Sequence, residues 1–341
     1  MIKTIGIVSL SSGILGEAMV AHEVEIGLRR LGEMGVKVKF MPNALKGFHF
    51  IQEHPEKRAE DLIEAYRDPE VDMIFCATGG DDTYRLMPYV FGKNRLKKVV
   101  NQKPFLGYSD TTINHFMLHK LGINTFYGQS FLSDVCELEN DMLPYSRKYL
   151  EELITTGTIR EIRPSDVWYE ERTSYGPDQI GVPRKKHFNP GFRLLQGTGT
   201  FSGKILGGCI DSIYDIFDNT RYGDSTALFQ KYELFPSLED WRGRILLLES
   251  SEEQPDPVRY RKMLEKLKHY GLFDVVSGVL VGKPMNAKYY EEYQQVLLSV
   301  IDKPTLPVLY NLSVGHAGPH AIIPFGVPAV VDAVHQVIRF E

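Results

Sequence analysis

The sequence predicts an α/β protein with a mostly parallel, doubly wound sheet in roughly its first 125 residues and a second domain near Gly203. In the first part, apolar runs of strand length alternate with segments of helical spacing, which is typical of βαβ units. Residues Met73–Ala77 are continuously apolar, as expected for a strand covered by helices on both faces. The chain has 341 residues, of which 43% are apolar and 24% charged, so two globular domains are expected.

The N-terminal elements are predicted in order from these patterns. The first strand is Ile5–Leu10, followed by a Ser/Gly turn and a helix over Glu17–Leu31. The apolar face of this helix is predicted to be Val20, Val24, Leu28 and Leu31. Further strands are expected at Val36–Phe40, Val71–Ala77, Pro104–Tyr108 and Asn124–Gly128, and further helices after Pro55 and over Thr83–Val90, Asn114–Leu121 and Met142–Thr155.

Residues 156–200 differ in composition from the sequence on either side. Prolines, charges and aromatic residues accumulate there, which indicates a linker or a functional loop rather than core. We therefore divide the chain into residues 1–160, 161–202 and 203–341. In the last part, Asp256 and Pro257 predict the start of a helix that ends before Gly271. Strands are expected at Lys204–Ile210, Arg244–Leu248, Val275–Val281, Leu306–Tyr310, Val327–Val331 and Val334–Phe340.

Charge and cysteine usage exclude several classes of protein. The net charge is −5 and no basic block occurs, so a nucleic-acid partner is not expected. The three cysteines, Cys76, Cys136 and Cys209, lack CxxC spacing and favour a reducing compartment, which predicts a cytoplasmic protein. No apolar run approaches 18 residues, so no membrane span is predicted.

Ser109 is the candidate nucleophile. It lies between a predicted strand and a predicted helix with almost no room for a loop, which is the setting of a nucleophile elbow. Gly107 precedes it by two residues, but Thr111 stands where G-x-S-x-G would have its second glycine. The alternative is an ordinary helix N-cap, which is the more common role for serine before a helix.

A serine nucleophile needs a base, an orienting carboxylate and an oxyanion hole. His316, between glycines in a predicted loop, is the best candidate base, and Glu249, at the end of an apolar strand, is the best orienting acid. The backbone N–H groups of Gly80 and Asp110 could bind an oxyanion. Alternatively, His316 lies on a surface loop, Glu249 points into solvent, and Gly79–Gly80 is only a tight turn.

Two other patterns lead to alternative sites. His115 and His119 have helical spacing, but without a third ligand they do not predict a metal site. The stretch Gly79–Thr83 is similar to the GGDGT loop of NAD and lipid kinases, although Asp82 replaces a glycine. A non-hydrolytic nucleotide-binding protein is therefore an alternative, in which Glu249 and His316 would be exposed and unrelated. No cofactor is predicted.

Three segments together carry a resemblance to a known family. They are Gly107–Asp110, Leu246–Glu253 and Gly315–His320 with Pro324–Gly326. In this order they resemble the LD-carboxypeptidase family of serine peptidases across nearly the whole chain. The resemblance implies a flavodoxin-like N-terminal domain, a C-terminal α/β domain with a small β-barrel-like sheet, and a homodimer. It also implies that Ser109 is the nucleophile, His316 the general base and Glu249 its orienter, with the N–H groups of Gly80 and Asp110 at the oxyanion.

Within that family, Leu248–Glu253 and the aromatic linker look more like the microcin C immunity branch. That branch hydrolyses the bond between a C-terminal aspartate and a modified nucleotide, and a linker tryptophan stacks on the nucleobase. Trp168 is the nearest match here, although it could equally be a packing residue. The other branch trims terminal D-alanine from murein tetrapeptides. The prediction is a serine carboxypeptidase that acts on a small peptide or peptidyl-nucleotide, with murein tetrapeptide as the alternative substrate.

Overall fold

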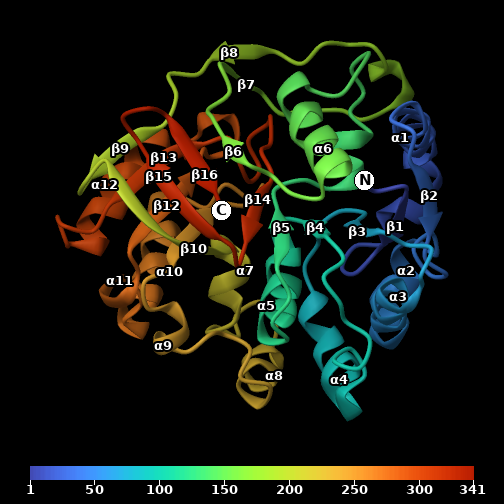
Figure 1. Ribbon diagram of the computed structural model, residues 1–341, viewed down its shortest axis with the longest axis horizontal. Coiled ribbons are helices and arrows are strands. Elements are labelled where there is room, and N and C mark those ends of the chain that lie inside the picture. The colour runs from blue at the N-terminus through green and yellow to red at the C-terminus, as the bar shows by residue number, and fades with distance from the viewer.

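The structure is a computed structural model that describes residues 1–341, and it contains two large sheets that lie side by side (Figure 1). The first sheet has six strands in the order β14-β5-β4-β3-β1-β2. Strands β1 to β5 are parallel, as predicted, and β14 pairs antiparallel with β5 at the edge. The bounds are β1 Thr4–Val8, β2 Lys37–Phe40, β3 Met73–Cys76, β4 Phe105–Gly107, β5 Thr125–Tyr127 and β14 Ile323–Phe325.

Helices accompany the first sheet in the predicted alternation, and α2 is an additional helix that the sequence analysis did not predict. They are α1 Ala21–Glu33, α2 Gly47–Glu53, α3 Pro55–Arg67, α4 Met87–Phe91, α5 Thr112–Lys120 and α6 Pro144–Thr156. Each predicted strand of this half has a counterpart within a few residues. Short turns of 3-10 helix precede α4 and α5. Helix α4 therefore begins at Met87 rather than at the predicted Thr83, whereas α5 begins at Thr112, two residues before the predicted Asn114.

The buried face of α1 differs from the prediction. Leu28 is 37% exposed, whereas Glu23, Gly27 and Arg30 are buried. Gly27 allows a close approach, because a Cβ there would lie 2.5 Å from Cys136 Sγ. The terminal nitrogens of the Arg30 guanidinium donate to backbone carbonyls, including that of Val135 at 2.8 Å. The prediction of Leu28 was wrong because Gly27 and Arg30, which contact the segment around residues 135–139, occupy the inner face instead.

The second sheet has eight strands in the order β6-β16-β15-β10-β11-β12-β13-β9. Its centre, β10 to β13, is parallel, and the flanking strands are antiparallel. Strands β6 and β9 form two free edges, so the sheet is open and the barrel-like form does not close. The bounds are β6 Glu161–Ile162, β9 Arg193–Gln196, β10 Thr200–Cys209, β11 Ile245–Glu249, β12 Gly278–Gly282, β13 Val308–Leu312, β15 Pro328–Asp332 and β16 Val337–Phe340.

The helices of the second half show which local signals predict a helix. For α10, Asp256 accepts a hydrogen bond from the Arg259 N–H at 2.8 Å and Gly271 ends the helix at φ +88°, as predicted. The sequence analysis missed α12, whose flanking residues Tyr289 and Asp302 are both left-handed and offer neither a side-chain cap nor a glycine. The bounds are α7 Ile210–Asp215, α8 Ser225–Lys231, α9 Leu238–Trp241, α10 Pro257–Tyr270, α11 Leu272–Val275 and α12 Tyr290–Ile301.

The segment predicted as a linker contributes to the fold. It supplies β6 and β9 to the second sheet and forms a separate hairpin of β7 (Val167–Tyr169) and β8 (Lys186–Phe188). The domain boundaries at residues 160 and 203 stay a prediction. No helix of the structure combines the length and apolar character needed to cross a bilayer.

A strand from late in the chain links the two sheets. Strand β14, far along the chain, lies beside β5 in the first sheet (Figure 1), and its neighbours on either side in sequence, β13 and β15, belong to the second sheet. The loop between β13 and β14 therefore passes over the carboxyl ends of both sheets. One continuous hydrophobic core runs through both sheets, which holds this crossing in place.

Candidate active site

Ser109 lies on a strained turn directly after β4. Its φ is +65°, a left-handed conformation that non-glycine residues adopt mainly where the surroundings enforce it. Its N–H donates to the Tyr127 hydroxyl at 3.2 Å, and a 3-10 turn leads from it into α5. Gly79 packs against it, since a Cβ on Gly79 would lie 2.6 Å from Ser109 Cβ. The predicted strand-turn-helix arrangement is present in the structure.

The three residues that the sequence analysis grouped lie in one chain of hydrogen bonds. Ser109 Oγ lies 3.0 Å from His316 Nε2, and His316 Nδ1 lies 2.7 Å from Glu249 Oε2. All three side chains are buried or nearly so. Ser109 follows β4 of the first sheet, Glu249 ends β11 of the second, and His316 lies in the loop between β13 and β14. This order of hydroxyl, imidazole and carboxylate can transfer a proton from the serine to the histidine.

The carboxylate of Glu249 is held from its other side as well. Its Oε1 accepts a hydrogen bond from the Tyr127 hydroxyl at 2.6 Å. Gly315 leaves room for Oε2, because a Cβ on Gly315 would lie 2.5 Å from that atom. The sequence analysis missed Tyr127; the signal for it was its place at the end of a strand next to the one before Ser109. Tyr127 thus links the backbone of Ser109 to Glu249.

A second carboxylate acts on the imidazole. Glu252 Oε2 lies 3.0 Å from His316 Nε2, the same nitrogen that faces Ser109. Burial lowers the pKa of His316, but the charges and hydrogen bonds of Glu249 and Glu252 outweigh burial and raise this pKa well above its usual value. The hydrogen bond to His316 lowers the pKa of Glu252 to about 2. With both acids in place, the imidazolium form of His316 is favoured.

The backbone around Ser109 offers free donors. Neither the N–H of Gly80 nor that of Asp110 has an acceptor within the protein. Gly80 has φ +148°, and a Cβ there would lie 2.3 Å from Ser11 Oγ, so this position requires glycine. The Asp110 carboxylate is held by the Ser11 hydroxyl at 2.6 Å and the Thr83 N–H at 2.9 Å. Two unpaired N–H groups thus flank the serine.

The acids of the Gly79–Thr83 turn have partners of their own. Asp82 pairs with buried Arg58 at 2.6 Å, and Asp81 with Arg221 at 2.6 Å. The nucleotide-binding alternative required Glu249 and His316 to be exposed and unrelated, and the structure contradicts this because they are buried and hydrogen-bonded to each other.

One histidine of the pair weighed above as metal ligands, His115, is used in packing. The ring nitrogens of His115 lie 2.7 Å from Thr125 Oγ1 and 3.1 Å from the Gly107 carbonyl oxygen. No group of three or more His, Cys, Asp or Glu side chains in the structure could hold a metal ion. His115 therefore belongs to the packing beneath Ser109.

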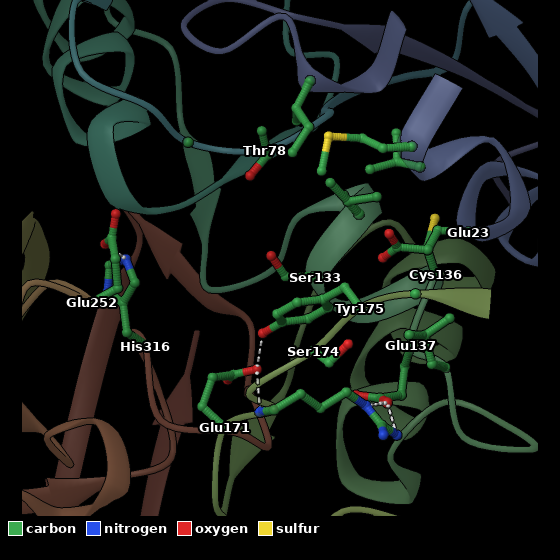
Figure 2. Close-up of a pocket in the computed structure, with 18 of the residues that line it drawn as sticks. Glu23, Thr78, Ser133, Cys136, Glu137, Glu171, Ser174, Tyr175, Glu252 and His316 are labelled. Atoms are coloured by element: carbon green, nitrogen blue, oxygen red, sulfur yellow. Dashed lines mark hydrogen bonds and ion pairs between the residues drawn. The ribbon is translucent and has the colours of Figure 1, made fainter. Parts of the chain in front are cut away.

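A cavity of about 870 Å³ opens beside Ser109 and His316. Its far wall is built by α1 and by the linker, and Figure 2 shows Tyr175 of the linker between the two sides. Trp168 does not line the cavity; its ring stacks on His187 with the ring centroids 4.3 Å apart. The structure thus brings Ser109, Glu249, His316, Gly80 and Asp110 together and leaves Trp168 outside.

Comparison with known proteins identifies the family. Residues 5–128 match the LD-carboxypeptidase N-terminal domain, and residues 202–331 match the LD-carboxypeptidase C-terminal domain. The chain belongs to the LD-carboxypeptidase family. This LD-carboxypeptidase family member is a serine-type carboxypeptidase, a hydrolase, as its sequence predicted.

Relatives and solved structures extend over nearly the whole chain. A probable murein peptide carboxypeptidase of Bacillus subtilis is 25% identical over 94% of this chain and 87% of its own. The microcin C7 self-immunity protein MccF of Escherichia coli is 24% identical over 81% of this chain and 76% of its own. An MccF-like protein of Streptococcus pneumoniae, crystallised in complex with AMP, is 61% identical with a TM-score of 0.99 and covers 100% of this chain and 99% of its own.

Proposed function

We propose that this LD-carboxypeptidase family member hydrolyses an amide at the C-terminus of a small peptide or peptidyl-nucleotide with Ser109, His316 and Glu249 as its catalytic triad. The observation that carries the proposal is the hydrogen-bonded series from Ser109 Oγ to His316 and Glu249, at 3.0 and 2.7 Å. Ser109 and His316 line the cavity, and Glu249 lies buried behind them. The imidazole faces the serine with one nitrogen and the carboxylate with the other, as general-base activation requires.

The proposed reaction has two stages. Neutral His316 accepts the proton of Ser109 as Oγ attacks the scissile carbonyl, and the N–H groups of Gly80 and Asp110 bind the oxyanion. His316 then gives this proton to the leaving amine, and an acyl-enzyme ester remains. Water, deprotonated by His316, attacks the ester, and the proton returns to Ser109. Glu249 stabilises the imidazolium in both stages.

The proposed substrate is a peptidyl-nucleotide. The E. coli MccF protein, which shares this fold, has been solved in complex with aspartyl sulfamoyl adenosine, and the Streptococcus pneumoniae neighbour contains AMP. A murein tetrapeptide is the second candidate, supported by the B. subtilis relative. The homodimer and the cytoplasmic location stay predictions. The contact between Trp168 and the substrate also stays a prediction. It requires the β7–β8 hairpin to move, because Trp168 does not line the cavity.

Substitution of Ser109 tests the chemistry. Ser109→Ala removes the nucleophile, so we expect no turnover of an aspartyl-adenylate amide or of a murein tetrapeptide, measured by mass spectrometry. Labelling by a phosphonate acyl-transfer probe should disappear as well, while the circular dichroism spectrum stays unchanged.

Ser133→Ala is the matched control, because Ser133 lines the same cavity outside the triad. It should keep both turnover and labelling. Turnover by Ser109→Ala at the wild-type rate would reject the proposed nucleophile. The ratio of kcat/KM for the two substrates decides between the two substrate classes.

A further inference from the structure

One carboxylate of the cavity has no partner. Glu23 lies on α1 and is only 5% exposed, yet its carboxylate has no hydrogen-bond donor or cation within reach. It lines the cavity, and Figure 2 shows it across the cavity from His316. A buried carboxylate without a partner is costly, so such a group in a cavity wall calls for an explanation.

The other carboxylates that line the cavity are paired. Glu137 binds Arg172 at 2.8 Å and Arg184 at 3.2 Å. Glu171 binds Arg184 at 3.0 Å, and Glu252 binds His316. The two guanidinium groups in the wall are therefore already engaged. The lining of the cavity contains four carboxylates but only two arginines. Glu23 is the carboxylate that has no cationic partner.

Apolar side chains form much of the wall around Glu23. Met19 and Val20, which precede Glu23 in the chain, line the same cavity, as does Leu138, and Cys136 lies beside the carboxylate in Figure 2. Burial, together with the negative charge of Glu137, raises the pKa of Glu23 to about 7. A cation on an alkyl stem would contact the apolar walls with its stem and supply the charge that Glu23 lacks.

We propose that Glu23 binds a primary ammonium group of the substrate, at the end of the cavity opposite Ser109. The inference rests on the proposed function, because it assumes that the substrate reaches from Ser109 across the cavity. The ammonium could be the free N-terminus of a peptide or the side chain of a diamino acid. Both offer the same chemistry, and the net negative lining of the cavity favours either.

The site itself can be tested without turnover. n-Butylammonium chloride at pH 8 should raise the Tm of the wild-type protein by about 2 °C over matched potassium chloride. Glu23→Gln should lose this shift. Glu25→Gln, which removes the same charge from an exposed position of the same helix, should keep it. An equal shift in Glu23→Gln, or no shift in the wild type, would overturn the site.

Peptide pairs test whether the ammonium belongs to the substrate. We would compare D-alanine-terminated tetrapeptides with a free or acetylated lysine side chain, and with a free or acetylated N-terminus. In one of these two pairs, the wild type should cleave the peptide with the free amine with a kcat/KM about tenfold higher than that of the acetylated peptide. Glu23→Gln should lose that preference. Equal preference in both proteins would overturn the proposal.

The two hypotheses can fail separately. If no peptide is cleaved and Ser109 is not labelled, but butylammonium still stabilises the protein through Glu23, the proposed function fails and the ammonium site stands. If Ser109 is labelled and adenosine rather than butylammonium stabilises the protein through Glu23, the catalytic proposal stands and this end of the cavity binds a nucleobase instead.

Discussion

His316 lies between two carboxylates that act on its two ring nitrogens. Glu249 binds Nδ1 from a fully buried position, whereas the Glu252 side chain, 62% exposed, reaches Nε2 from the cavity. Both favour the imidazolium, but His316 must be neutral to act as the proposed general base. A substrate that displaces Glu252 from Nε2 would therefore lower the pKa of His316 and free the nitrogen that faces Ser109.

Glu252→Gln should change the pH dependence of the reaction. Loss of one negative charge lowers the pKa of His316, so the neutral imidazole persists to lower pH. We expect the acidic limb of the kcat/KM profile to move to lower pH, while Glu253→Gln, next in the chain, leaves it in place. An unchanged limb in Glu252→Gln would show that Glu252 does not act on the base.

The ends of strands and the loops after them set the geometry of the site. Tyr127 and Glu249 each end a strand, Ser109 follows one, and His316 lies in the loop after β13. The fold brings these strand ends to one region, so residues that are far apart in sequence can contact one another. Gly315 is the point of closest approach, with φ +96° and no room for a side chain beside Glu249.

Gly315→Ala should impair catalysis more than stability alone explains. The new methyl group would displace the Glu249 carboxylate from Nδ1, so we expect kcat to fall by about tenfold or more. Gly122→Ala is the control, because Gly122 has φ +78° but open space at its Cβ position. It should cost about 1 kcal/mol of unfolding free energy and leave kcat unchanged. Equal kcat in the two variants would contradict this account.

Both halves of the molecule contribute residues to the candidate site and hold them in place. One sheet contributes Ser109, the other contributes Glu249, and the chain segment that carries His316 passes between them before β14 joins the first sheet. Trp241 of the second half is fully buried and packs against Phe116 of α5, with ring centroids 6.4 Å apart. The two halves therefore share one core.

Unfolding should be a single event as a result. We expect the urea transitions followed by far-UV circular dichroism, by tryptophan fluorescence and by loss of activity to coincide within error. The second half supplies a strand to the first sheet, so neither half can open without disturbing the other. A transition in activity that clearly precedes the other two would show that the halves separate first.

Local signals account for what the sequence predicted well. The Asp256 cap and Gly271 defined α10, and the apolar strand, Gly107 and the helical spacing defined the turn at Ser109. Signals were absent or misleading elsewhere. Helix α12 has no cap residue from which it could be predicted. Leu28 matched the helical period, although Gly27 and Arg30 occupy the buried face of α1.

The sequence by itself determined the alternation of strands and helices, the sharp turn at Ser109 and the candidate triad, because spacing, caps and motifs are properties of neighbouring residues. Only the tertiary structure decided that Tyr127 supports Glu249, that Glu252 competes for His316 and that Glu23 lacks a cation. Those facts depend on which side chains face one another across elements distant in the chain. Partners of that kind leave no local pattern.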